Sequence, residues 1–111
     1  MLENTEFTIF RKSKITPKKI GQFVTIYKRP NGFNMPFDST DNFDFIIIEV
    51  VEGDYRGRFK FGKEVLIKNG VISHGETRGK MGLRVYPPWI KPTAKQAINS
   101  QKWQLSHFSS P

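Results

Sequence analysis

The sequence predicts an α+β fold: a mostly antiparallel sheet of four to five strands with a C-terminal helix packed on it. Three observations predict this class. Several short segments alternate apolar and polar side chains, as half-buried strands do. Residues 43–51 form an apolar run of the length and β-branched composition of a central strand. After residue 93 the apolar spacing changes to that of an amphipathic helix.

The first third of the chain predicts two strands separated by a short helix. Residues 5–10 alternate and predict a strand. Residues 15–21 contain a capping Thr followed by Pro and end with Gly, which are start and stop signals of a helix of one to two turns. Residues 23–27 are rich in β-formers, and residues 29–32, with Pro and Asn-Gly, predict the turn that closes this strand.

The middle of the chain predicts a hairpin followed by a short helix. The strand at 43–51 ends at the turn residues 52–54. Residues 58–61 then alternate strictly, with two phenylalanines inward and two basic side chains outward, which predicts the hairpin partner. Residues 63–70 end in Asn-Gly and predict a short helix.

The C-terminal part predicts a loop, a last strand and the packed helix. Residues 74–82 are polar and Gly-rich, which is typical of a mobile loop. Residues 83–86 predict a strand that the following Pro-Pro pair stops. The helix is expected from a cap at Thr93 to about His107, with Ala97, Gln101 and Leu105 on its core face.

Length and composition predict one domain spanning residues 1–111. The chain has ten phenylalanines, 37% apolar residues and no cysteine, so the phenylalanines must supply the core without a disulfide. The longest apolar run is interrupted by Asp44 and Glu49 and is too short to span a membrane. The N-terminus has no basic-then-apolar signal pattern. We therefore expect a cytoplasmic protein.

Charge is segregated along the chain, whose formal net charge is +8. Residues 8–36 hold seven basic side chains and no acidic one. Residues 38–54 hold six acids and no Lys or Arg, and from residue 56 onward eleven basic side chains accompany two acids. This pattern is compatible with an ordinary solvated surface, but basic stretches that converge on one face would indicate an anionic polymer as partner.

Several motifs resemble the MepB family, and together they cover nearly the whole chain. They are residues 14–25 (KITPKKIGQFVT), 36–38 (PFD), 84–89 (RVYPPW), 91–97 (KPTAKQA) and 101–104 (QKWQ). The resemblance implies a bacterial protein, and an architecture similar to the cores of restriction-type endonucleases. It therefore suggests DNA binding, with or without cleavage. The family is named from an operon that also encodes a drug-efflux pump and its repressor, which implies a third alternative, a protein-interaction module in drug-response regulation.

The residues needed for cleavage match the nuclease pattern only in part. Such enzymes hold Mg²⁺ with an Asp at a strand start and an acid-x-Lys triplet on the next strand. Asp44 and Lys60 fit two places, but Arg58 stands where the triplet needs an acid, and a guanidinium repels the metal. If the protein is a nuclease, Glu49 or Asp54 would have to complete the set with Asp44 and Lys60, which requires an unusual geometry. We expect a non-catalytic protein with no metal and no cofactor, Mg²⁺ entering only under the nuclease alternative.

Other motifs carry weaker indications of function. His74 and His107 are too far apart in sequence to predict a metal pair. Residues 75–82 could hold phosphate through Arg78 and Lys80, although glycine there is also ordinary loop chemistry.

Nucleic acid, with double-stranded DNA as the expected form, is the partner that the basic residues favour, because Lys and Arg release counterions when they neutralise phosphates. Tyr86, Trp89 and Trp103 could stack on bases, although aromatic rings at such positions are more often held in the core. The candidate binding residues are Lys14, Lys18, Lys19, Lys28, Arg29, Arg58, Lys60, Arg84, Lys91, Lys95 and Lys102.

Overall fold

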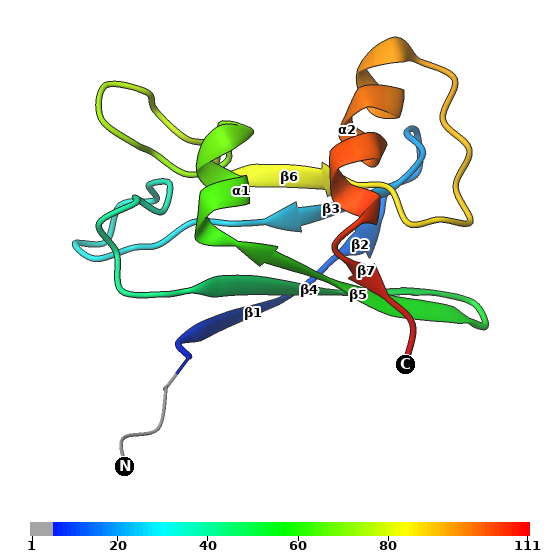
Figure 1. The fold of residues 1–111 in the computed structure, drawn as a ribbon, viewed down its shortest axis with the longest axis horizontal. Coiled ribbons are helices and arrows are strands. Elements are labelled where there is room, and N and C mark those ends of the chain that lie inside the picture. Colours follow the sequence, from blue (N-terminus) through cyan, green and yellow to red (C-terminus); the bar gives the residue numbers. More distant parts are fainter. Residues whose placement is uncertain (1–5) are drawn as a thin grey trace.

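The computed structural model describes residues 6–111, which form two small sheets and two helices (Figure 1). The elements, in chain order, are β1 Thr8–Lys12, β2 Lys14–Ile15, β3 Gln22–Thr25, β4 Phe45–Glu52, β5 Tyr55–Gly62, α1 Lys63–Lys68, β6 Gly82–Val85, α2 Lys95–Leu105 and β7 Phe108–Ser109.

The larger sheet has four strands in the order β1-β4-β5-β7. β4 lies in the interior of this sheet, as its apolar run predicts, and β5 pairs with it as the predicted hairpin partner. β1 pairs with β4 in parallel. A parallel pair needs a long connection, and the chain between β1 and β4 supplies one by building β2 and β3 on the way.

The smaller sheet has three antiparallel strands in the order β2-β3-β6 and lies above the larger one in Figure 1. The core fills the space between the two sheets. Ile46 and Ile48 of β4 and Phe59 of β5 contribute to it from one sheet, and Val24 and Val85 from the other; all five are buried. Each of these strands alternates inward and outward side chains, so both sheets also present an outward face.

A buried polar pair joins the sheets at their crossing. Ser13, between β1 and β2, donates its hydroxyl to Gln22 Oε1 at 2.7 Å. Gln22 in turn donates from Nε2 to the carbonyl of Val51 at 2.9 Å. Because both side chains are almost fully buried, each bond satisfies groups that would otherwise lose hydration without compensation.

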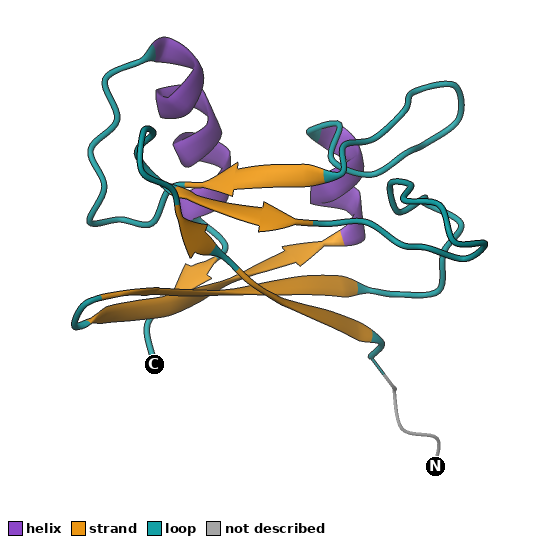
Figure 2. Cartoon of the chain, turned by 180° about the vertical axis from the view of Figure 1, so that it is seen from behind, coloured by secondary structure: helices purple, strands orange, loops and turns teal. Residues whose placement is uncertain are grey.

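Both helices lie on one side of the strands, in front of them in Figure 1 and behind them in Figure 2. α1 is short, as predicted, and follows β5 directly. α2 packs against β6 through Ala97 and Gln104. Gln104 is fully buried and bonds the backbone at the end of β6, accepting from Tyr86 N at 2.9 Å and donating to Arg84 O at 3.0 Å.

The α+β class and the packed C-terminal helix are confirmed, whereas several details of the prediction are wrong. The helix runs from Lys95 to Leu105 and its N-cap residue is Ala94, so Thr93 does not cap it. Residues 15–21 form no helix: Ile15 belongs to β2 and residues 17–21 form a bend. The single sheet is instead two sheets, because the chain between β1 and β4 pairs with β6 and not with β5. Leu105 is 37% exposed, and Gln104 takes the core position instead.

Several strand boundaries, and the identity of the last strand, also differ from prediction. The first strand begins at Thr8 and runs on to Lys12, two residues beyond the predicted end, and Thr5 lies outside the described residues. The strand at Gly82–Val85 is followed by β7 and so is not the last one. Within residues 6–111, neither helix has the length and apolarity needed to cross a membrane.

Candidate nucleic-acid interface

The outward face of the smaller sheet carries a row of basic and aromatic side chains. Lys14 of β2 pairs with Phe23 of β3, and Phe23 pairs with Arg84 of β6. Directly paired residues share one face of a sheet. Since the next residues along β3, Gln22 and Val24, are buried, this row must point away from the core.

A groove of about 370 Å³ lies beside this row, between β6, the bend at residues 17–21 and α2. Its basic lining residues are Lys19, Lys80 and Arg84, and α2 contributes the polar side chains of Gln96 and Ser100. We call it the basic groove. Among residues 6–111, no carboxylate lines it.

Further lysines surround the basic groove. Lys14 and Lys18 are exposed next to it, on β2 and in the bend. Lys95, at the start of α2, lines an adjoining hollow that shares Gln96 and Ser100 with the groove. We call these three the rim lysines. Basic residues from the N-terminal stretch, Lys14 to Lys19, thus meet those of the C-terminal stretch, Lys80 to Lys95, around one surface.

Arg84 both shapes the groove and carries charge into it. Its Nη1 donates to Thr16 Oγ1 at 3.0 Å and to the carbonyl of Ile20 at 3.2 Å, which holds the bend against β6. Gly21 allows this close approach, because its φ is +78° and a Cβ there would lie 2.7 Å from the carbonyl oxygen of Val85. The Thr-Pro and Gly signals that predicted a helix therefore mark a tight bend.

Two predicted binding residues are engaged elsewhere. Lys28 forms an ion pair of 2.7 Å with Asp41, and both side chains are only about a quarter exposed. Arg29 donates to the carbonyl of Gly32 at 2.9 Å within the predicted turn. Lys91 and Lys102 are exposed, but neither lines the groove.

Arg58 and Lys60 lie on the outward face of the larger sheet, away from the basic groove. Glu49 is the cross-strand partner of Arg58. Lys60 approaches Glu6 at 3.5 Å and its ammonium lies 4.2 Å from the centre of the Phe45 ring. Each of these basic residues thus has a carboxylate beside it.

The three residues of the nuclease alternative are not assembled in one place. Asp44 and Lys60 line a pocket of about 720 Å³, together with Glu6, Glu64 and His107. Glu49 is absent from that pocket and lines another hollow beside Arg58. The Asp44 carboxylate already accepts from Phe7 N at 2.9 Å.

The donor set of this pocket does not fit a hard cation. In the part of the chain that the structure describes, no three His, Asp or Glu side chains come together closely enough to hold a metal ion. A Mg²⁺ ion needs several oxygen ligands in near-octahedral geometry.

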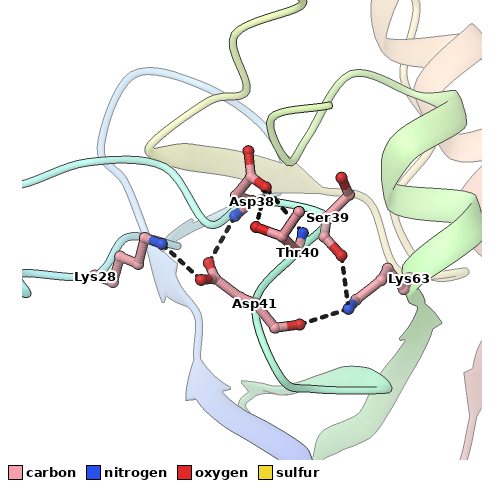
Figure 3. Close-up of polar contacts among 6 residues, drawn as sticks. All are labelled: Lys28, Asp38, Ser39, Thr40, Asp41 and Lys63. Carbon is pink, nitrogen blue, oxygen red and sulfur yellow. Dashed lines mark hydrogen bonds and ion pairs between the residues drawn. The ribbon is translucent and has the colours of Figure 1, made fainter. Parts of the chain in front are cut away.

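The family-like PFD segment builds a loop whose polar groups bond one another (Figure 3). Asp41 accepts from the backbone of Asp38 at 2.8 Å, and Lys63 donates to the carbonyls of Ser39 and Asp41 at 3.0 and 2.6 Å. Hydrogen bonds from the hydroxyl and the backbone N–H of Thr40 lower the pKa of Asp38 below its ordinary value of 3.8. These hydrogen bonds fix the conformation of the loop at residues 38–41 and hold it against Lys63 of α1.

The aromatic side chains that could have stacked on bases are packed against the protein. Tyr86 is 9% exposed. Trp103 packs on Phe61, with ring centres 5.1 Å apart. Trp89 stacks on Tyr55 at 5.1 Å and donates its indole N–H to Glu52 at 2.9 Å.

The sequence did not reveal the role of Phe23. This residue is 38% exposed on the face that borders the groove, but it was predicted only as a strand residue.

The sequence also did not reveal the role of two glutamines of α2. Gln101 was assigned to the core face, yet it donates from Nε2 to the carbonyls of Pro87 and Ile90 at 3.1 and 2.8 Å. Gln104 donates to the backbone of β6. The QKWQ motif therefore orders the RVYPPW segment. The two glutamines of this motif are three residues apart and so lie on one face of the helix, and this spacing was the sequence signal that could have predicted their shared role.

The fold and the groove are those of a small basic α+β domain, and the chain belongs to the MepB-like family, whose model matches residues 1–110. The chain is also similar to a solved structure described as the crystal structure of MepB. The TM-score is 0.87 and the sequence identity 36%, over 91% of this chain and 68% of that chain. No curated protein matches the sequence.

Proposed function

We propose that this protein binds DNA by neutralising backbone phosphates in the basic groove. The observation that supports this most is the convergence of Lys19, Lys80 and Arg84 on one groove to which no described residue contributes a carboxylate. With the three rim lysines, six cations surround this surface. That number falls within the range of phosphate contacts made by proteins that bind DNA through its backbone.

The chemistry of the groove suits phosphate oxygens. Arg and Lys donate charge-assisted hydrogen bonds, and Ser100 and Gln96 of α2 add neutral donors. Contacts of this kind read no base sequence, so affinity should be similar for unrelated sequences and should fall steeply with salt.

A metal-dependent nuclease is the second candidate, because Asp44 and Lys60 do share one pocket. Under this alternative, the fold would be a restriction-endonuclease-like core. The nuclease is less well supported than phosphate binding, because Glu49 lies in another hollow and Arg58 beside it repels a cation.

One experiment separates the candidates. Fluorescence anisotropy of labelled DNA is measured from roughly 50 to 200 mM salt, and six phosphate contacts predict a loss of about 10³-fold in affinity over that range. The same preparation is incubated with supercoiled plasmid and Mg²⁺ or Mn²⁺, where we expect no nicking. Nicking that Asp44→Ala abolishes would favour the nuclease. No DNA binding at the lower salt would contradict the proposal and favour a protein-interaction module.

A further inference from the structure

We infer that Phe23 is a stacking platform for one unpaired base, so that the basic groove takes single-stranded DNA in preference to a duplex. This inference rests on the proposed function and names the form of nucleic acid that the site favours. It departs from the double-stranded partner that the sequence led us to expect.

The position of the Phe23 ring is the first observation. The ring borders the basic groove, and 38% of the residue is exposed although it sits in the central strand of its sheet. Its tip lies over Gly82 of β6, where a Cβ would come within 2.2 Å of Cζ. The ring therefore lies down across the neighbouring strand, in space that only glycine leaves open.

The surroundings of the ring are the second observation. Lys14 and Arg84 flank Phe23 in the same row, and the Arg84 guanidinium lies 5.8 Å from the ring centre. Lys19 and Lys80 line the groove next to it. A ring with cations on several sides provides both the contacts that a nucleotide needs, a surface for the base and donors for the phosphate.

A duplex cannot use this arrangement, because its bases are stacked on one another and present only their edges in the grooves. An unpaired base offers a free face, and stacking on an aromatic side chain tolerates any base. Exposure of an aromatic ring is not enough to make it a stacking platform for a nucleotide, as Phe10 illustrates. It is 65% exposed on the outward face of the larger sheet, but the hollow that it lines contains Glu49, whose carboxylate offsets part of the positive charge that Arg11, Lys12 and Arg58 bring there.

The opposing interpretation is that Phe23 merely covers Gly82. A leucine would also cover that glycine but has no ring to stack, whereas a tyrosine keeps the ring. Phe23→Leu and Phe23→Tyr therefore distinguish the two interpretations, and Phe10→Leu is a matched control on the other sheet. Circular dichroism and thermal melting verify that each variant folds.

The test measures affinities at fixed salt for a single strand, a blunt duplex of the same sequence and an abasic strand of the same length. Wild type should bind the single strand about 5- to 150-fold more tightly than the abasic strand, since stacking of one base has that strength. Phe23→Leu should remove this difference and leave duplex affinity unchanged. Phe23→Tyr and Phe10→Leu should behave as wild type.

Two results would overturn the inference. Equal wild-type affinity for the normal and abasic strands would show that no base stacks, even if every DNA is bound with steep salt dependence, in which case the proposed function stands alone. A loss of duplex and single-strand affinity by the same factor in folded Phe23→Leu would make Phe23 a structural residue. Failure to bind any DNA would remove both proposals together.

Discussion

The outward faces of the two sheets carry similar side chains and differ in one respect, the placement of carboxylates. Both faces carry lysine, arginine and an exposed phenylalanine. On the larger sheet Glu49 is the cross-strand partner of Arg58 and Glu6 approaches Lys60, whereas none of the acids in the part of the chain that the structure describes lines the groove of the smaller sheet. Net charge alone could not distinguish these faces, because the electrostatic potential at a phosphate depends on whether a carboxylate lies beside each basic side chain.

The largest expected effect concerns the support of the smaller sheet. Gln104→Leu should lower the free energy of unfolding by about 2–4 kcal/mol, because it leaves the buried backbone groups of Tyr86 and Arg84 without partners. Denaturant unfolding measures this. Gln96→Leu, on an exposed position of the same helix, is the matched control and should change stability by less than about 0.5 kcal/mol. Equal effects of the two variants would contradict this role of Gln104.

An intermediate effect is expected from Arg84→Lys, which keeps the charge but loses the fork that reaches Thr16 and Ile20. We expect a loss of about 1–2 kcal/mol in stability, since these bonds are only partly buried. The salt dependence of DNA binding should stay the same, because one positive charge remains. A reduced salt slope with unchanged stability would contradict this role, because it would mean that the guanidinium is needed at the phosphate and not for holding the bend.

The smallest effect concerns Asp38 in the loop of Figure 3. Its folded pKa is lowered by the bonds from Thr40, so its contribution to stability is complete above its ordinary value of 3.8 and is lost as pH falls through the lower, folded value. The stability difference between wild type and Asp38→Asn should therefore be constant near neutral pH and should narrow below about pH 4. Thermal melting across this pH range measures the difference, and a difference that does not change down to about pH 3 would contradict the assignment.

The sequence was informative wherever one face of a strand or helix had to be buried. The apolar run of β4 and the strict alternation of β5 predicted the central hairpin, because period-two burial determines which side chains point inward. The helix α1 was predicted from a different signal, the Asn-Gly pair at its end, and Asn69 is its C-cap residue.

The site was less predictable, because it depends on contacts between distant segments. Thr16 and Gly21 carry helix signals in isolation, but Arg84, more than sixty residues away in the sequence, bonds the segment into a bend. The location of Phe23 beside Gly82 likewise arises from the pairing of β3 with β6. Charge along the chain identified Lys19 and Arg84 as candidates, but only the fold separates them from Arg58 and Lys60.

The central claim is that DNA is bound by the groove of the smaller sheet and not by the outward face of the larger one. The most direct measurement compares the salt slopes of two double variants on one DNA, Lys19→Ala with Lys80→Ala and Arg58→Ala with Lys60→Ala. Each pair removes two cations, so the change in net charge is the same. We predict that the first pair reduces the log-log slope by about 1.8 while the second leaves it near the wild-type value. An equal reduction by both pairs, or a reduction by the second alone, would contradict the account.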